Sequence, residues 1–77
     1  MSKETLQVGD IIYFDAHKLF QEELVGDDPH ASGYIEKIQE THRKDILKYH
    51  IRLFEPIFFE TYVELFEEEI FKHKQDI

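Results

Sequence analysis

Two apolar runs with a period of two dominate the second half of the chain. They cover residues 49–54 and 57–66 and are separated by a hinge at Glu55 and Pro56. Alternation over six or more residues, rich in β-branched and aromatic types, predicts paired strands that are half buried. The side chains expected on one face are Tyr49, Ile51 and Leu53 before the hinge and Phe59, Thr61, Val63 and Leu65 after it.

A helical interpretation of the same region stays open as an alternative. Residues 45–71 contain many good helix formers, and Phe58, Tyr62 and Leu65 are spaced near helical intervals. Pro56 lies in the middle of this region, where it would cost a continuous helix about 3 kcal/mol. The alternative to strands is therefore a pair of helices broken at Glu55.

The first half of the chain predicts a turn and a strand. Val8, Gly9 and Asp10 form a tight turn, because glycine has unrestricted φ and aspartate can accept a hydrogen bond from the nearby backbone. Residues 11–14 follow as a strand with large apolar groups on both faces, which favours a strand covered on both sides or bent at a barrel corner. Residues 1–7 are expected to be loose, apart from Leu6, which is expected to pack at an edge.

The middle of the chain predicts a short helix, a loop and a second strand. Apolar residues at helical spacing predict a short helix over residues 17–24. The chain is then broken at residues 26–29, which end in aspartate before proline. Residues 30–32 are expected to form an exposed loop. Gly33 is expected to open a strand over residues 34–39 and to mark a bulge or a tight bend.

Together these segments predict one mostly β domain. Residues 43–45 are expected at a hairpin tip, and residues 67–74 as a helical turn, near 66–70, or a short closing strand. Seventy-seven residues suffice for a single small domain, and no repeat or linker divides residues 1–77. The predicted architecture has about five short strands over residues 8–72.

The order of these segments resembles small SH3-like barrels of the Tudor, Agenet and KOW type. The resemblance rests on the turn 8–10 followed by the strand 11–13, on residues 33–38, and on residues 49–53 with the later 67–70. It implies a binding module without catalysis. Tudor-like members hold methylated lysine or arginine in an aromatic cage, and the positions that match by strand location are Tyr13, Phe14 and Tyr34. The chain has no tryptophan, and no motif locates the cage.

Charge is the most informative global property. The net charge is −8, distributed as −5 over residues 1–28, +2 over residues 29–54 and −5 over residues 55–77. An acidic field repels nucleic acid and membrane surfaces and attracts basic proteins. The longest uninterrupted apolar run, residues 11–14, is too short to cross a bilayer. The chain has no cysteine, and residues 1–4 lead into no apolar run of the length that a signal peptide needs, so we expect a cytoplasmic protein.

These properties predict a partner-binding surface that is acidic and aromatic. Spaced carboxylates can imitate phosphates, so the partner is expected to be a basic or nucleic-acid-binding protein, and the chain a regulator or inhibitor of the kind that phages and mobile elements carry. A second acidic group, Glu22, Glu23, Asp27 and Asp28, and a solvated surface without function remain as alternatives. The predicted partner-binding residues are Glu60, Tyr62, Glu64, Glu67, Glu68, Glu69, Tyr13 and Tyr34.

Catalysis and metal binding are not expected. The three glycines are dispersed, and no carboxylate lies in an apolar segment that would raise its pKa. The five histidines lack the spacing of a helical zinc site, so we expect neither a metal nor a cofactor. The histidine positions are 17, 30, 42, 50 and 73.

Two other functions compete with binding of a basic protein. The first is nucleic-acid binding by the hairpin 42–52, where positive charge is concentrated; the same cations are expected to pair with the protein's own acids. The second is a structural subunit that self-associates through an exposed phenylalanine face formed by Phe58, Phe66 or Phe71. The oligomeric state is not predicted by the sequence. The cations of the hairpin, with one histidine, are His42, Arg43, Lys44, Lys48 and Arg52.

Overall fold

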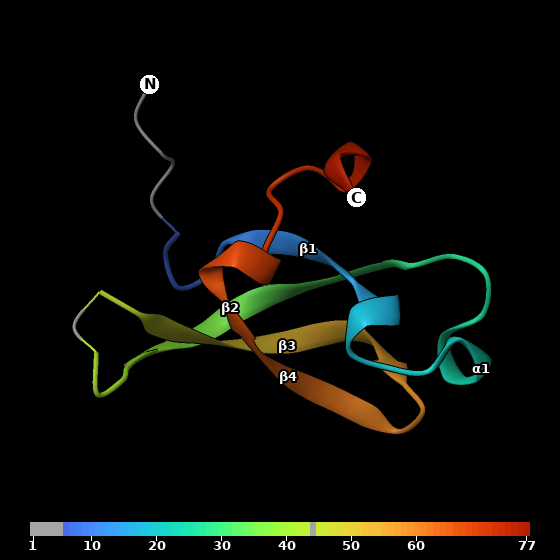
Figure 1. The fold of residues 1–77 in the computed structure, drawn as a ribbon, viewed down its shortest axis with the longest axis horizontal. Helices are drawn as coiled ribbons and strands as arrows, with labels where there is room; N and C mark the ends of the chain where they lie inside the picture. The colour runs from blue at the N-terminus through green and yellow to red at the C-terminus, as the bar shows by residue number, and fades with distance from the viewer. Residues whose placement is uncertain (1–5, 44) are drawn as a thin grey trace.

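The protein forms a four-stranded antiparallel sheet in which each strand pairs with its neighbours in sequence (Figure 1). The computed structural model describes residues 6–43 and 45–77, so the expectations for residues 1–5 and for Lys44 lie outside the described residues. The mostly β fold class is confirmed, and the helical alternative for residues 45–71 is wrong. The strands are β1 (Ile11–Asp15), β2 (His30–Glu40), β3 (Leu47–Ile57) and β4 (Glu60–Phe66).

The sheet is open, and a barrel of about five strands is not what the described residues form. β1 and β4 are the two edge strands. After β4, the 3-10 helix η2 (Glu67–Glu69) leads the chain back to β1 (Figure 1), where Tyr13 and Phe71 exchange two backbone hydrogen bonds of 2.8 Å. This contact is an isolated bridge. It does not extend into a fifth strand, because the chain soon turns into the 3-10 helix η3 (Lys74–Asp76).

β2 is longer than predicted at its amino-terminal end. The residues expected in an exposed loop, 30–32, belong to the strand, since Ala31 and Ser32 pair with Phe14 and Tyr13 of β1. Gly33 therefore lies inside β2 and does not open it. A Cβ atom at Gly33 would lie 2.4 Å from the carbonyl oxygen of Arg52 on β3. The close approach of the two backbones explains why this position is glycine. The bulge predicted at Gly33 lies further along β2, where the pairing with β3 shifts between Ile35 and Lys37.

The helix predicted over residues 17–24 is divided into two shorter helices. The 3-10 helix η1 (Ala16–Lys18) is followed by an extended residue, Gln21, and then by α1 (Glu22–Val25). Gly26 ends α1 with a φ of 89°, as the predicted break at residues 26–29 requires. The predicted helical turn near 66–70 is confirmed as η2. Across residues 6–43 and 45–77, no helix is long and apolar enough to span a membrane.

The turn between β3 and β4 lies at Phe58 and Phe59, three residues after the predicted hinge. Ile57 pairs with Glu60, so the hairpin has a two-residue loop. Pro56 lies within β3, in a stretch where the register shifts between Arg52 and Ile57. Proline lacks a backbone N–H and is tolerated at such irregularities. The hinge prediction was wrong because aspartate, asparagine and glycine are the usual signals of a tight hairpin, and none of these is present.

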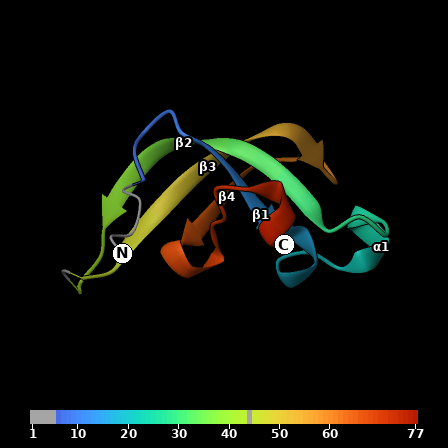
Figure 2. The ribbon, with the colours of Figure 1, turned by 90° about the horizontal axis from the view of Figure 1, so that it is seen from above.

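The core lies on the concave side of the sheet. Figure 2 shows the long strands β2 and β3 as an arch, with η1 and the C-terminal segment beneath it. The predicted alternation in residues 49–53 is confirmed, and Leu6, which was expected to pack at an edge, packs against the core. β1 is buried on one face only, since Ile11 is 55% exposed. The buried apolar residues are Ile12, Phe14, Ala16, Ile35, Tyr49, Ile51, Leu53 and Leu65.

We expect Gly33→Ala to destabilise the protein. Its new methyl group would lie 2.4 Å from the Arg52 carbonyl oxygen and 2.8 Å from Cγ2 of Ile51. Relief of this overlap requires β2 and β3 to separate, which we expect to cost about 1–3 kcal/mol of unfolding free energy. Urea unfolding measures the loss, and Ser32→Ala in the same strand is the control. A stability within about 0.5 kcal/mol of wild type would contradict the steric argument.

We expect Phe58→Asn with Phe59→Gly to stabilise the protein. The two phenylalanines have φ values of 44° and 70°, a region that favours asparagine and glycine in a two-residue turn. Removing the strain should raise the unfolding free energy by about 1 kcal/mol. Phe58→Leu with Phe59→Leu is the matched control, because it removes the rings but keeps the unfavourable backbone. Equal stability of the two double variants in urea would show that the turn is not strained.

Candidate functional site

The outer face of the sheet gathers several of the predicted binding residues. Tyr34 pairs with Arg52, and Arg52 pairs with Tyr62, so these three residues form a row across β2, β3 and β4. Glu64 lies two residues beyond Tyr62 and pairs with His50. The predicted alternation of β4 thus places Tyr62 and Glu64 on one face of a sheet.

Two ion pairs neutralise charge on this face within the protein. Nε of Arg52 donates to Glu36 at 2.8 Å, and Nζ of Lys48 lies 3.4 Å from Glu64. The Arg52 hydrogen bonds hold the pKa of Glu36 below its ordinary value, and Glu36 raises the pKa of Arg52. Two cations of the predicted nucleic-acid hairpin are therefore engaged with the protein's own acids. This weakens the nucleic-acid alternative, because binding of phosphate depends on available cations.

Tyr62 is held in a polar network of three side chains. Its hydroxyl hydrogen bonds with Nδ1 of His50, and Nε2 of His50 hydrogen bonds with Oε1 of Gln39 at 2.7 Å. The rings of His50 and Tyr62 lie 5.5 Å apart. Desolvation raises the pKa of the Tyr62 hydroxyl, and the charge of Glu64 raises it further. Tyr62 is thus a fixed part of the sheet surface.

An aromatic cage of the kind implied by the Tudor resemblance cannot include all three predicted positions. Phe14 is 1% exposed and packs in the core, so its ring cannot line a surface cage. Tyr13 lies on β1, where its backbone bridges to Phe71. Tyr34 instead lies beside Phe54, with ring centroids 6.0 Å apart. Phe14 faces the core, whereas Tyr13, one residue earlier, faces away from it.

The predicted acidic group separates into different environments. Glu64 is paired with Lys48, and Glu69 accepts a hydrogen bond of 2.9 Å from the backbone N–H of Phe66 at the start of η2. Glu60 lies at the opposite end of β4, beside the hairpin turn. Glu67 and Glu68 line a pocket together with residues around the start of β3. A structural role therefore accounts for Glu64 and Glu69 without any partner.

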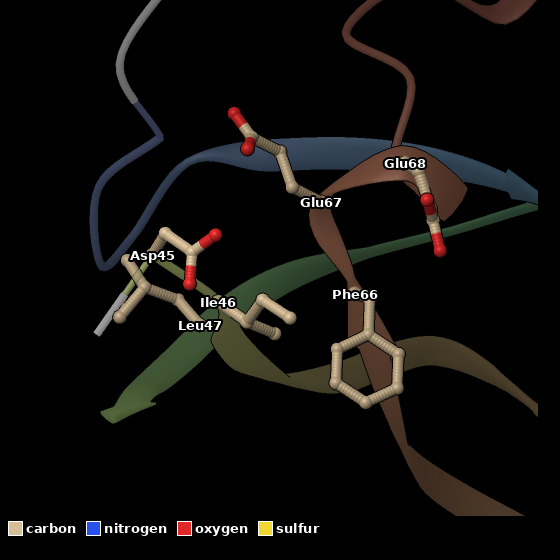
Figure 3. A pocket seen from close by; sticks show the side chains of 6 residues that line it. All are labelled: Asp45, Ile46, Leu47, Phe66, Glu67 and Glu68. Carbon is tan, nitrogen blue, oxygen red and sulfur yellow. The ribbon is translucent and has the colours of Figure 1, made fainter. Parts of the chain in front are cut away.

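The pocket at Glu67 and Glu68 has a volume of about 380 Å³ and combines apolar side chains with carboxylates. Its lining comes from two segments far apart in sequence, the connection between β2 and β3 and the corner between β4 and η2 (Figure 3). Figure 3 shows the carboxylates of Glu67 and Glu68 pointing in different directions around this corner. The lining residues are Asp45, Ile46, Leu47, Phe66, Glu67 and Glu68.

Four of these lining residues are not among the predicted partner-binding residues, and of these four only Phe66 was named for another interaction, self-association. Asp45, Ile46 and Leu47 follow a turn in which the Thr41 hydroxyl donates to the carbonyl oxygen of Ile46 at 2.8 Å and accepts from the backbone N–H of Arg43 at 3.2 Å. An apolar pair directly after the polar segment 40–45 was the available signal. Only the pairing of Lys48 with Phe66 brings this segment beside η2.

The pocket suits an aliphatic chain that ends in a positive charge. Ile46, Leu47 and Phe66 offer contact to methylene groups, and the neighbouring carboxylates offer acceptors for a cationic head. Lysine and arginine side chains have this composition. The charge of Glu67 also acts on Tyr49 in the core. Burial raises the pKa of the Tyr49 hydroxyl, and the negative charge of Glu67 raises this pKa further.

The other acidic group and the histidines have different surroundings. Glu22, Glu23 and Asp27 are exposed on or beside α1, whereas Asp28 lies 2.5 Å from Nδ1 of His30. His17 Nε2 lies 2.7 Å from the carbonyl oxygen of Gly26. Within the described part of the chain, no three histidine, aspartate or glutamate side chains are grouped so as to hold a metal ion.

Comparison of the chain with protein-family models, with curated proteins and with solved structures finds no significant match. The candidate site is therefore defined by its geometry.

An acidic contact also joins the two ends of the chain. The Asp10 carboxylate accepts hydrogen bonds from the backbone N–H of Gln7 at 2.9 Å and from Nζ of Lys72 at 3.2 Å. The Gln7 bond, followed by the Lys72 bond, holds the pKa of Asp10 below its ordinary value of 3.8. Hydrogen bonds from the backbone and ring of His30 lower the pKa of Asp28 in the same direction.

We expect the melting temperature to fall in acid, below about pH 4. A carboxyl group whose pKa is lower in the folded state stabilises the protein above its unfolded pKa, and the stabilisation is lost as the pH falls through the folded pKa. Asp10→Asn should lower the melting temperature at neutral pH and make its decrease in acid shallower. Asp27→Asn removes the same charge from an exposed position and is the control. If the melting temperature of Asp10→Asn fell as steeply in acid as that of wild type, this would contradict the stabilising role of the Asp10 contact.

Proposed function

We propose that this protein is a small acidic protein-binding module, without catalytic activity, that engages a basic surface of a partner protein. The observation that carries this proposal is the pocket at the corner between β4 and η2, which combines three apolar and three acidic residues. We name it the acidic pocket, consisting of Asp45, Ile46, Leu47, Phe66, Glu67 and Glu68.

The composition of the acidic pocket favours a lysine or arginine side chain of the partner. A methylene stem of this kind packs on apolar groups while its charged end remains in a polar environment. Asp45 and Glu68 are exposed, so a cation can reach them without the cost of burying an unpaired charge. Phe66 is 40% exposed and provides an aromatic surface for the same side chain.

The overall charge supports the same class of partner. The net charge of −8 accelerates encounter with a basic protein and opposes encounter with nucleic acid. The cations Lys48 and Arg52 add little to a phosphate-binding surface, since each lies beside an acid of this chain. A basic protein surface is thus favoured over a nucleic-acid backbone.

The element order supports an SH3-like organisation as the finer description of the fold. Four antiparallel strands are followed by a 3-10 helix, after which Phe71 bridges to β1. In this description the segment after η2 takes the position of a short closing strand. The resemblance favours a binding module over an enzyme, although fold alone does not assign function.

A module of this size and charge is suited to act as a regulator or inhibitor. Carboxylates spaced along β4 and η2 can occupy a surface that otherwise binds phosphates, which is the action of a nucleic-acid mimic. Proteins carried by phages and mobile elements include inhibitors of this kind. In this proposal the partner is itself a nucleic-acid-binding protein.

The test compares two variants that lose the same charge. One removes the charge of the acidic pocket by Asp45→Asn, Glu67→Gln and Glu68→Gln, and the other removes it from α1 by Glu22→Gln, Glu23→Gln and Asp27→Asn. Partners are captured from cytoplasmic extract with wild type, and the dissociation constant of the purified partner is measured by calorimetry at several salt concentrations. We expect the pocket variant to bind about tenfold or more weakly, with a shallower salt dependence.

The α1 variant controls for the general field of the protein, and we expect it to change affinity by less than about threefold at physiological salt. Thermal unfolding of both variants separates loss of binding from loss of fold. Equal weakening by the two variants would show that net charge alone attracts the partner. Unchanged affinity in the pocket variant would remove the acidic pocket from the interface. Saturable micromolar binding of DNA or RNA by wild type at physiological salt would favour the nucleic-acid alternative.

A further inference from the structure

The turn between β3 and β4 presents two adjacent phenylalanines to solvent. Phe59 is 90% exposed and Phe58 is 61% exposed. Their ring centroids lie 5.5 Å apart, so the two rings form one apolar surface. We call these two residues the hairpin tip. The β3–β4 hairpin projects at one end of the sheet (Figure 1).

Folding does not explain the two phenylalanines, because their side chains are exposed and their backbone conformation is unfavourable. Exposed phenylalanine rings contribute little to burial of apolar surface. Both residues have positive φ, 44° for Phe58 and 70° for Phe59, where residues other than glycine are uncommon and side chains are strained. The Asn-Gly pair that such a turn favours would satisfy the backbone without exposing any ring. The phenylalanines therefore oppose local stability at a position where the fold does not use their side chains.

The hairpin tip continues into further apolar surface on the same strand. Phe54 is 51% exposed, so three of the exposed large apolar residues lie within residues 54–59. Phe54 and Phe58 line a pocket of about 470 Å³ that is also lined by Leu24 and Val25 of α1. Clustered exposed apolar groups mark interaction sites, whereas single ones do not.

We infer that the hairpin tip is the apolar anchor of the protein interface and that it inserts into an apolar pocket of the partner protein bordered by lysine or arginine. This inference rests on the proposed protein-binding function. Exposed carboxylates flank the hairpin tip at Glu55 and Glu60, and they complement basic groups around such a pocket. Aromatic side chains that fill a partner's pocket are typical hot spots of protein interfaces.

The carboxylates of Glu55 and Glu60 disfavour two other binding partners of an apolar tip, a membrane and a second copy of the chain. An anionic membrane surface repels Glu55 and Glu60, although the phenylalanines alone would suit a bilayer. Self-association through two hairpin tips would bring the four flanking carboxylates of two copies together, on chains that each carry a net charge of −8. Lys74 lines the neighbouring pocket, but the residues adjacent to the two rings in sequence are Ile57 and Glu60.

The hairpin tip and the acidic pocket occupy opposite ends of β4. Glu60 begins the strand beside the hairpin tip, and Phe66 ends it in the acidic pocket. Seven residues of strand separate the two sites by about 20 Å. A standard protein interface is wide enough to cover this distance. One partner can therefore receive the phenylalanines at one end and present a cation at the other.

The experiment places a photo-crosslinker at the hairpin tip. Phe59→p-benzoylphenylalanine keeps an aromatic side chain at the position, and its adducts are mapped by mass spectrometry after irradiation in cytoplasmic extract. We expect an adduct on the protein captured by wild type, at apolar residues that have lysine or arginine beside them. Phe58→Asn with Phe59→Gly should weaken the affinity of that purified partner by about 30-fold or more. The loss should occur without any decrease in melting temperature.

Further measurements test binding of the hairpin tip to a membrane, its binding to a second copy of the chain, and crosslinking that is not specific to the tip. Sedimentation with vesicles of phosphatidylcholine, with and without phosphatidylserine, should leave wild type in solution, and analytical ultracentrifugation should show a monomer. Val8→p-benzoylphenylalanine places the crosslinker at another exposed apolar residue, on the turn before β1, and should not give the same adduct. Adducts to lipid or to a second copy, or wild-type affinity in the Asn-Gly variant, would overturn the inference.

The acidic-pocket variant distinguishes failure of this inference from failure of the proposed function. If the Asn-Gly variant binds as wild type and the pocket variant does not, the inference is wrong and the proposed function stands. If only the Asn-Gly variant loses affinity, the hairpin tip is the anchor and the assignment of the acidic pocket is wrong. If neither variant loses affinity for the captured protein, both assignments are wrong.

Discussion

The close approach of β2 and β3 at Gly33 is the contact on which the arrangement of this sheet depends. A Cβ atom there would overlap the carbonyl oxygen of Arg52, so glycine permits the pairing of Gly33 with Leu53. That register places Ile35 opposite Ile51 in the core. It also places Tyr34 opposite Arg52 on the outer face. A shift by one residue would exchange the two faces, so packing and surface are determined together.

The sequence predicted those elements whose side chains alternate regularly between core and solvent. Tyr49, Ile51 and Leu53 are buried, as their period of two indicated. Residues 30–32 were expected in a loop, since histidine, alanine and serine carry no strand signal. Their place in β2 comes from pairing with β1, which is a tertiary contact. The prediction of a fifth strand was wrong for a related reason. The local pattern in residues 67–74 does not show how far the bridge between Phe71 and Tyr13 extends.

The turn at Phe58 and Phe59 was missed because its residues contradict its geometry. The sequence pattern predicts that adjacent phenylalanines lie in a strand and that proline lies at a hinge. Here Pro56 is absorbed in an irregular part of β3, and the chain reverses at the aromatic pair. Sites where sequence-level reasoning fails in this way are often functional, because selection for function overrides the local preference.

The structure gives two of the predicted binding residues a defined internal contact. The acids were proposed as a group since they are close in sequence, yet Glu64 and Glu69 satisfy contacts within the protein. Asp45, Ile46 and Leu47 join Glu67 and Glu68 only through the pairing of distant strands, so no local pattern contained the acidic pocket.

The two proposed contact sites lie at the two ends of β4, an edge strand of the sheet. One end exposes apolar rings on a strained turn, and the other presents carboxylates over apolar side chains. A monomer would be more stable with hydrophilic turn residues and more soluble with fewer exposed rings. In the proposed interface, a partner covers β4 along its length, buries the rings at one end and places cations beside the exposed Asp45 and Glu68 at the other. The two features are therefore more simply explained by one interface than by two separate accidents of sequence.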